Sequence, residues 1–443
     1  MTQMIRVLTF TLTLAAAGLR AAEITTIAGT GTPGFSGDGG TATAAQLDAP
    51  RGLALHSATG DLYITDYSNN RVRRVTPAGI ISTVAGNGEI GLVVEGPSLA
   101  TPFIALYGVS WAPNTENGRL LIASSDGLHS IEPNGGRLRA LVVDRAVPVM
   151  DASSGTLYVS DFYRIVRREA GGEFTTIAGS DEAEFGDTGD GGPANQARLT
   201  AAASLAVDRL GRVWFADAAS HRVRRFLPGG NIDAVAGTGA AGFGGDAGPA
   251  NSAALNEPRG IAVDVAGNLY IADGYNLRIR RVRASDGVIE TFAGTGREET
   301  AGDGGDALKA SFASLSHLAV SCTGLFVSDG LAQVRMIRLT DPLLALRPIA
   351  DVETGAEFIR PGKTFAIEGC YLAESSARAE TDRSLPVKLG GAEVLVNGVP
   401  AGLVAVSSTR LEVQLPAGTA AGAVTVRVNV GTKTVGEVAA EIR

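Results

Sequence analysis

The chain has 443 residues, of which 45% are hydrophobic, 5% are aromatic and 58 are glycine. This composition favours many short strands joined by turns, and it excludes collagen-like and disordered chains. The 46 acidic residues outnumber the 38 basic ones, giving a formal charge of −8, and this predicts no nucleic-acid partner because such binding requires a basic surface.

The N-terminal residues 1–22 have the pattern of a secretory signal peptide. Arg6 precedes the apolar stretch 7–17, which is followed by small residues. This stretch is too short to cross a bilayer, and no later apolar run is long enough. We therefore expect an exported protein with no membrane insertion, located extracellularly, in a periplasm or at a cell surface. The alternative is an uncleaved N-terminal tail.

Residues 256–296 are the clearest copy of a repeated unit. The runs 260–263 and 268–272 flank the turn Asp264-x-x-Gly267, a pattern that predicts a β-hairpin. Two further runs, 278–280 and 288–293, add a third and a fourth strand. Each unit is therefore predicted to be a four-stranded antiparallel meander.

An aspartate closes the second predicted strand of every copy. It is found at Asp66, Asp126, Asp161, Asp217, Asp273 and Asp329, and the last three spacings are 56 residues each. Six copies predict six blades, because a four-stranded sheet cannot bury both faces alone and radial stacking covers them. The run EITTIA at residues 23–28 matches a fourth strand, whereas the sixth copy has three strands. We expect this N-terminal strand to complete the sixth blade and close the ring.

Three segments of the first copy carry a resemblance to a known repeat. They are PRGLA at 50–54, GDLYITD at 60–66 and NNRVRRV at 69–75. They resemble the NHL repeat, and the resemblance extends over residues 23–339, weakest in the second copy. It implies an all-β fold, a six-bladed NHL-type β-propeller over residues 23–340, which generally serves in molecular interactions.

The repeat ends after Leu339. Residues 341–362 are predicted to be a linker and the first part of a C-terminal domain, and residues 363–443 contain short strands with a hairpin turn at Asn397-Gly398. The size fits an immunoglobulin-like β-sandwich. The segments 389–391, 394–401 and 404–411 resemble bacterial IPT/TIG-type domains, which implies the same sandwich.

The sequence contains two cysteines, Cys322 and Cys370. In an exported protein such a pair can oxidise to a disulfide. The alternative is two separate thiols.

The connections between copies are rich in glycine and aspartate, at 34–40, 187–192, 242–246 and 302–306. We interpret them as loops that satisfy their own polar groups, with the loop phenylalanine packed on the blade. We predict no cofactor. The alternative is a weak Ca²⁺ site, although each loop offers one or two carboxylates and Ca²⁺ needs six to eight oxygens. The candidate ligands are Asp38, Asp187, Asp190, Asp246, Asp303 and Asp306.

The recurring second-strand aspartates have a structural interpretation. Each is expected to bond the backbone of the polar turn that follows it. Arg71, Arg222 and Arg278 each follow the aspartate of their copy by five residues and are expected to offset the carboxylate charge.

Aligning the copies places a set of polar residues around the mouth of the central channel. The candidate binding residues are Arg51, Tyr107, Arg259 and Ser316, with His317 beside the last. Arginine and tyrosine around a concavity suit acidic or aromatic partner groups. The alternative is that the Pro-Arg-Gly segments are merely the entrance turn of the repeat.

The histidines argue against a catalytic metal. The four histidines, His56, His129, His221 and His317, do not occupy matching positions, so they predict no zinc site, and no catalytic residue is identified. The leading hypothesis is an exported non-enzymatic binding scaffold whose loop-bearing face engages a protein or glycan partner. The alternative is a propeller enzyme, a lyase or lactonase, with a metal in its central channel.

Overall fold

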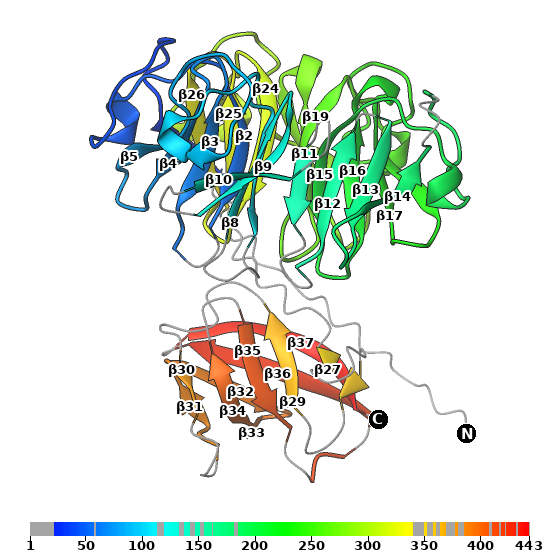
Figure 1. Ribbon diagram of the computed structural model, residues 1–443. Coiled ribbons are helices and arrows are strands. Elements are labelled where there is room, and N and C mark those ends of the chain that lie inside the picture. Colours follow the sequence, from blue (N-terminus) through cyan, green and yellow to red (C-terminus); the bar gives the residue numbers. More distant parts are fainter. Residues whose placement is uncertain are drawn as a thin grey trace, which may run out of the picture.

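The computed structural model divides into two groups of strands, one over residues 23–338 and one over the C-terminal residues (Figure 1). The described residues are 22–56, 59–112, 119–132, 137–141, 147–150, 155–161, 163–180, 185–339, 350–351, 358–359, 364–368, 377–379, 385–406, 410–415, 418–420, 422–430 and 433–442. The predicted signal peptide lies outside them except for Ala22, and it stays a prediction.

Residues 23–338 form six antiparallel sheets, numbered 1 to 6 in chain order, in which consecutive strands pair as hairpins. Sheets 1 to 3 are built from β2 (Pro50–Leu55), β3 (Leu62–Asp66), β4 (Arg71–Val75) and β5 (Ile81–Ala85); β7 (Gly108–Ala112), β8 (Arg119–Ser124), β9 (Gly127–Ile131) and β10 (Arg137–Leu141); and β11 (Val147–Met150), β12 (Leu157–Asp161), β13 (Arg164–Arg168) and β14 (Phe174–Gly179).

Sheets 4 to 6 repeat this order. They are built from β15 (Ala202–Val207), β16 (Val213–Asp217), β17 (Arg222–Phe226) and β18 (Ile232–Ala236); β19 (Pro258–Val263), β20 (Leu269–Asp273), β21 (Arg278–Val282) and β22 (Ile289–Ala293); and β24 (Leu315–Val320), β25 (Gly324–Asp329) and β26 (Gln333–Arg338). In sheet 5 the first strand begins at Pro258, two residues before the apolar run 260–263 that was predicted for it from the sequence, because the Pro-Arg-Gly segment already belongs to the strand.

The fourth strand of sheet 6 comes from the N-terminus. β1 (Glu23–Ala28) pairs antiparallel with β26, with Ile24 opposite Ile337 and Thr26 opposite Arg335. Ile24 and Ala28 are fully buried. The N-terminal strand therefore lies beside the third strand of the last copy, which is the pairing that the repeat count predicts.

Neighbouring sheets pack face to face over six hydrophobic cores. Each core combines residues from two sheets that follow one another, and one core joins sheet 6 to sheet 1 through Val334 and Leu53. The first strands also contact each other in this order, and β24 contacts β2. Glycine permits the approach, since a Cβ added at Gly52 would lie 2.9 Å from Gly108 Cα.

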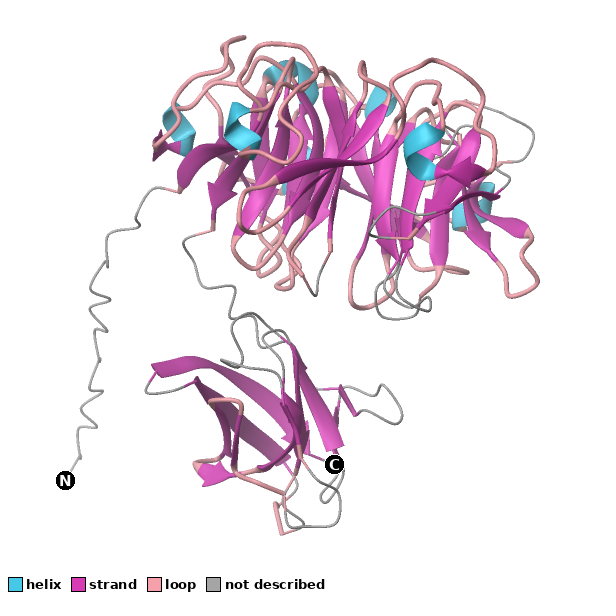
Figure 2. Ribbon diagram, turned by 60° about the vertical axis from the view of Figure 1, so that its left-hand side comes forward, coloured by secondary structure: helices cyan, strands magenta, loops and turns pink. Residues whose placement is uncertain are grey.

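Short 3-10 helices occur at one end of the sheets (Figure 2). Those in the connections are η1 (Ala42–Ala44), η2 (Ser98–Ala100), η3 (Ala194–Gln196), η5 (Ala250–Ser252) and η7 (Ala307–Lys309), and those in second-to-third turns are η4 (Ala218–Ser220) and η6 (Gly274–Asn276). Because successive strands reverse direction, both kinds of turn lie at the same end, called here the loop face. In the described residues no helix has the length and apolar character needed to cross a membrane.

The C-terminal residues form two further sheets. One contains β27 (Ala350–Asp351), β29 (Thr364–Glu368), β35 (Arg410–Gln414), β34 (Gly402–Val406) and β30 (Ala377–Arg378); the other contains β28 (Phe358–Ile359), β37 (Lys433–Ile442), β36 (Gly422–Val430), β32 (Ala392–Val396), β31 (Lys388–Leu389) and β33 (Val399–Pro400). Both sheets contribute to one core, with Phe365 and Leu411 from the first and Val394 and Val426 from the second. The C-terminal part therefore has a hydrophobic core of its own.

Candidate functional site

A buried arginine joins the first loop to sheet 1. The guanidinium of Arg73 donates to Asp38 Oδ1 (2.8 Å) and to Asp66 Oδ2 (3.2 Å). It also donates to the backbone carbonyl of Ser36 (3.0 Å), and Asp66 accepts the N–H of Asp48 (2.7 Å). One side chain therefore holds the loop carboxylate, the loop backbone and the end of the second strand.

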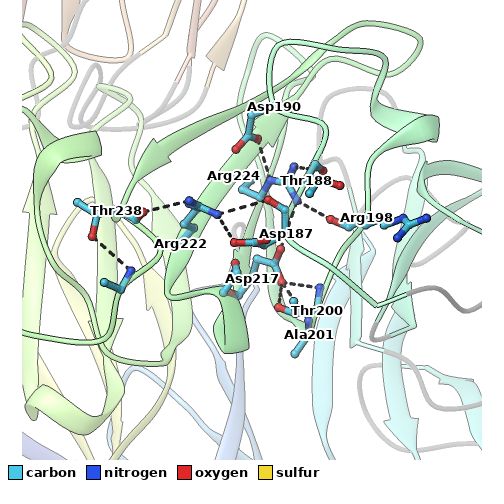
Figure 3. A network of polar contacts seen from close by, with 12 residues as sticks. Asp187, Thr188, Asp190, Arg198, Thr200, Ala201, Asp217, Arg222, Arg224 and Thr238 are labelled. Atoms are coloured by element: carbon cyan, nitrogen blue, oxygen red, sulfur yellow. Dashed lines mark hydrogen bonds and ion pairs between the residues drawn. The ribbon is translucent and has the colours of Figure 1, made fainter.

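The same arrangement recurs in sheets 4, 5 and 6. Each has a third-strand arginine between a loop aspartate and a second-strand aspartate: Arg224 between Asp190 and Asp217, Arg280 between Asp246 and Asp273, and Arg335 between Asp303 and Asp329. All four arginines are fully buried. In sheet 4 the carbonyls of Thr188 and Arg198 accept further hydrogen bonds from Arg224 (Figure 3). A buried charge is tolerated when it is paired and hydrogen-bonded in this way.

The second-strand carboxylates are strongly desolvated. Burial raises the pKa of Asp66, Asp273 and Asp329, while the hydrogen bonds that each receives and the adjacent guanidinium oppose that rise. Because water does not reach these carboxylates, the arginine is the positive group that stabilises their ionised form.

Arg71, Arg222 and Arg278 do not have the predicted role. Arg71 donates to the carbonyls of Asn69 and Asn87, and the ring centre of Phe35 lies 3.8 Å from its guanidinium carbon. Arg278 stacks in the same way on Phe243, at 4.0 Å. Sheet 4 replaces the ring by Asp187, which bonds Arg222 at 2.7 Å. These arginines begin the third strand and bond loop groups, whereas the arginine two positions later neutralises the aspartate. The predicted packing of the loop phenylalanine is seen in sheets 1 and 5.

All six candidate Ca²⁺ ligands have protein partners. Asp38, Asp190, Asp246 and Asp303 are paired with the buried arginines, Asp187 is paired with Arg222, and Asp306 accepts the N–H of Leu308. A cation at any of the first five would have to compete with a guanidinium group. Among the described residues no group of three or more histidine, cysteine, aspartate or glutamate side chains is arranged to hold a metal ion.

Sheets 2 and 3 depart from the pattern. In sheet 2, His129 lies opposite Ile122. It therefore occupies the position that Arg73 has in sheet 1, where Arg73 lies opposite Ile64. Its Nε2 lies 2.9 Å from Ser124 Oγ and 3.4 Å from Asp126 Oδ1, and burial lowers the pKa of His129. Asp126 in turn accepts the N–H of Val93 from the preceding loop (2.6 Å).

In sheet 3 the same position is Val166, opposite Val159. The connection before this sheet contains no glycine- and aspartate-rich segment of the kind found at 34–40, 187–192, 242–246 and 302–306. The residue at this position therefore changes with the loop that precedes the sheet: arginine where the loop carries aspartate, and valine where that loop is missing.

A short segment of the preceding loop, a glycine pair in sheets 1 and 4, extends the outer edge of five sheets. The N–H of Gly39 donates to Ile81, and Ile81 donates back to Gly40. The equivalent bonds join Gly191 and Gly192 to Ile232, Ala247 and Gly248 to Ile289, and Gly304 to Ile24. In sheet 2, β6 (Gly96–Pro97) pairs with β10, and in sheet 6, β23 (Gly305–Asp306) pairs with β1. These segments protect strand edges that would otherwise expose unpaired backbone groups.

Three of the predicted binding residues lie with tyrosines at the loop face. The guanidinium carbon of Arg51 is 3.6 Å from the ring centre of Tyr67, and that ring is 6.2 Å from Tyr107. In sheet 5, Arg259 lies 4.8 Å from the ring of Tyr275 and donates to Glu257 (3.1 Å). The structure therefore brings Arg51 and Tyr107 together through Tyr67, which was not among the residues predicted from the sequence. The signal that could have located Tyr67 and Tyr275 is their recurrence one or two residues after the second-strand aspartate.

Ser316 and His317 contact the neighbouring first strands. Ser316 Oγ donates to the carbonyl of Pro50 at 3.4 Å. A Cβ added at Gly260 would lie 2.8 Å from His317 Cα, and desolvation lowers the pKa of His317 to about 4. These contacts place both residues in the packing between β24 and the strands on either side of it.

Cys322 is disulfide-bonded. The other cysteine of the sequence, Cys370, lies outside the described residues, so the predicted bridge between the two stays a prediction.

Comparison with protein families identifies the repeat. A model of the NHL repeat matches residues 47–75, and a model of the teneurin NHL domain matches residues 225–298. The chain contains an NHL-type β-propeller. The Pro-Arg-Gly entry, the second-strand aspartate and the buried third-strand arginine of sheet 1 all lie within the matched NHL repeat.

Curated relatives share this part of the chain. Teneurin-4 of Mus musculus is 28% identical over 269 residues, which cover 58% of this chain and 8% of teneurin-4. Protein SUPPRESSOR OF QUENCHING 1, chloroplastic, of Arabidopsis thaliana is 26% identical over 296 residues, or 60% of this chain and 27% of that protein. The chain therefore aligns with a minor part of either relative.

Two solved structures from Bacteroides thetaiotaomicron have a similar fold. One is a structural genomics protein of unknown function, with a TM-score of 0.56 and 18% identity, covering 72% of this chain and 76% of that one. The other is an auxiliary nutrient binding protein, with a TM-score of 0.52 and 16% identity, covering 71% and 75%. At these identities the similarity concerns the fold alone.

Proposed function

We propose that this chain is an exported, non-enzymatic binding scaffold whose NHL propeller engages a protein partner through the loop face. The observation that carries the proposal is the pairing of Arg51 with Tyr67 and Tyr107, and of Arg259 with Tyr275, on that face. Arginine and tyrosine are enriched among the residues that dominate binding energy in protein interfaces.

The loops around these pairs are held in place before any partner binds. Four of them are tied to their sheets by fully buried arginines and by backbone bonds to the outer strand. A preorganised surface loses less conformational entropy on binding, which favours affinity. One protein of similar fold is an auxiliary nutrient binding protein, which supports a binding role.

We further propose that the six sheets are the blades of a closed propeller and that β1 completes the last blade. The pairing of β1 with β26 supports this, as does the core shared by sheets 6 and 1. Closure would make the loop face one continuous surface to which every sheet contributes.

The remaining assignments concern the C-terminus and the location of the protein. We propose that the C-terminal sheets are a bacterial IPT/TIG-type immunoglobulin-like sandwich, supported by two sheets over one core. Export is supported by the signal-like segment 1–22 and by the disulfide at Cys322, because disulfides persist in oxidising compartments.

The test is capture of a partner by purified protein, followed by calorimetric titration with the captured protein. The variant Arg51→Ala/Tyr107→Ala/Arg259→Ala should weaken binding by about a hundredfold or more, as expected for loss of interface hot spots. The matched control is Leu210→Ala/Leu227→Ala/Arg283→Ala, whose exposed residues lie in turns at the opposite end of the sheets and should leave binding unchanged. Equal binding by the two triple variants would refute the assigned face, and a captured glycan would refute the protein partner.

A further inference from the structure

The connection before sheet 2 carries three aliphatic side chains that face the solvent, Ile90, Leu92 and Val94, called here the apolar stripe. They are 77%, 67% and 70% exposed, the highest values for large hydrophobic side chains in the described part of the chain. The side chain of Val93 points the other way and packs against the core shared by sheets 1 and 2. This alternation is that of an extended segment. Single exposed aliphatic residues are normal, whereas a contiguous group of them marks an interaction site.

Backbone hydrogen bonds hold the apolar stripe in the solvent. The buried residue Phe103 accepts a hydrogen bond from the N–H of Gly91 (3.4 Å) and donates to the carbonyl of Glu89 (3.3 Å). The N–H of Val93 donates to Asp126 Oδ2 (2.6 Å), in the second-to-third turn of sheet 2. The stripe therefore lies at the loop face and is fixed before any partner binds, which lowers the entropy that binding costs.

The stripe includes the position of the loop aspartate in other sheets. The N–H of Gly86 donates to the carbonyl of Ser98, the first residue of η2 (2.9 Å), and the equivalent glycines donate in the same way to the first residues of η1, η5 and η7. Four residues before the helix, sheet 2 has Val94, where the other loops have aspartates that bond the buried arginines, namely Asp38, Asp246 and Asp303. The arginine position of sheet 2 is His129. This loop therefore presents an apolar side chain in place of a neutralised carboxylate.

Two carboxylates flank the apolar stripe. Glu89 precedes Ile90 and Glu95 follows Val94, and both glutamate side chains are exposed. The carboxylate of Glu89 accepts a hydrogen bond from the neutral amide of Asn87 (3.1 Å), and neither glutamate forms an ion pair with a described residue. In an extended chain the two glutamates are about 20 Å apart. The surface thus has an apolar centre with a negative charge at each end.

We propose that the apolar stripe binds an extended segment of the partner protein, in which alternate aliphatic residues lie between two basic residues. Aliphatic side chains at the same spacing cover the stripe, and the basic residues pair with Glu89 and Glu95. The charges disfavour other occupants, because a second copy of the stripe would bring four carboxylates together and an anionic membrane would repel both glutamates. The inference rests on the proposed function, since it assumes that the loop face receives a protein partner, and it names the chemistry of that partner.

Synthetic peptides test the proposal by methyl NMR of the full chain, which detects binding at millimolar affinity. The basic probe KISLSVK repeats the spacing of residues 89–95, EIGLVVE, with lysine in place of each glutamate. It should shift the methyl signals of the stripe saturably and leave those of Leu331 unshifted, a residue that is 65% exposed without flanking glutamates. The acidic peptide EISLSVE should bind at least about fivefold more weakly, because two attractions become repulsions.

Variants identify the stripe and its charges as the site. Leu92→Ser should weaken binding of the basic probe about fivefold or more, because the central aliphatic contact is lost. The matched control Leu331→Ser removes an equally exposed leucine and should leave the affinity unchanged. Glu89→Gln/Glu95→Gln keeps the size of both side chains but removes their charges, and should reduce the difference in affinity between the two peptides to less than about twofold.

Several outcomes would overturn the proposal. These are the absence of saturable shifts in the wild type, equal affinities of the two peptides for the wild type, and wild-type affinity in Leu92→Ser. Shifts of the stripe signals with neutral phosphatidylcholine vesicles would assign the stripe to a lipid surface. A concentration-dependent dimer that Leu92→Ser abolishes would assign it to a second copy of the chain. Either assignment would overturn the partner segment.

The variant Arg51→Ala/Tyr107→Ala/Arg259→Ala separates this inference from the proposed function. Its apolar stripe is intact, so it should bind the basic probe within about twofold of the wild type. If the probe fails to bind the wild type while the triple variant still weakens binding of the captured partner, the inference fails alone. If the probe binds as expected while the triple variant leaves partner binding unchanged, the proposed arginine and tyrosine contacts fail and the stripe stands.

Discussion

At the scale of single residues, the buried third-strand arginines determine how the loops are held. Arg73, Arg224, Arg280 and Arg335 are fully buried, and each is bonded to two carboxylates and to loop carbonyls. A guanidinium group can be buried only where such partners are present. For this reason the arginine accompanies the loop aspartate and is replaced by Val166 where that loop is missing.

Replacing one of these arginines should strongly destabilise the protein. In Arg280→Met the carboxylate of Asp273 stays buried without its cation, and we expect the free energy of unfolding to fall by about 3–5 kcal/mol. The measurement is urea unfolding followed by fluorescence. The matched control is Arg283→Met, which breaks solvent-accessible ion pairs with Asp286 and Glu290 and should leave the unfolding midpoint nearly unchanged. Similar midpoints for the two variants would contradict this account of the buried network.

At the scale of elements, a stable sheet requires that its apolar faces are buried and that the backbone groups of its outer strand are bonded. The faces are buried by the neighbouring sheets. In five sheets the outer strand is bonded by a short segment of the preceding loop. The glycine- and aspartate-rich loops before sheets 1, 4, 5 and 6 are thus edge-covering segments whose aspartate bonds the buried arginine of the same sheet.

The pairing of β1 with β26 predicts that the N-terminal strand is essential for stability. A protein beginning at Gly29 loses that pairing and the burial of Ile24 and Ala28. About five hydrogen bonds at roughly 0.5–1.5 kcal/mol each amount to about 3–8 kcal/mol, against a typical domain stability of about 5–15 kcal/mol. Thermal unfolding followed by circular dichroism should lose its cooperative transition, whereas a protein beginning at Glu23 should keep it. An unchanged melting curve would show that β1 is dispensable.

At the scale of the whole molecule, the hydrophobic cores divide the chain into two parts. Six cores lie between consecutive sheets of residues 23–338, so each of those sheets shares buried surface with both neighbours. The seventh core contains only C-terminal residues. The propeller sheets should therefore unfold together and separately from the C-terminal sheets.

Differential scanning calorimetry should accordingly show two transitions for the wild type. Arg280→Met should lower the midpoint temperature of the larger transition, which belongs to the propeller, by several degrees. The loss of each kcal/mol of stability lowers the midpoint by about 2–4 °C in domains of 150–250 residues, and by somewhat less in a larger domain such as this one. The smaller transition should keep its temperature because none of its core residues is altered. A single transition, or a shift of both, would indicate that the two parts unfold as one unit.

The repeat pattern in the sequence determined the all-β fold and the assignment of strands to repeats. Alternating apolar residues, turn glycines and an aspartate at a spacing of 56 residues act locally, so they can be recognised without tertiary structure. The same local signals located the glycine- and aspartate-rich loops, and the role of Arg51, Tyr107 and Arg259 in binding stays a proposal.

Only the tertiary structure decided which groups bond one another. Arg73 rather than Arg71 bonds Asp66, because the partner of a buried charge depends on how far each side chain reaches across the folded sheet. Tyr67 joins Arg51 to Tyr107 across two sheets, and Phe35 of the first loop packs on Arg71 of the third strand. These contacts link residues distant in the chain, and local sequence patterns carry little information about them.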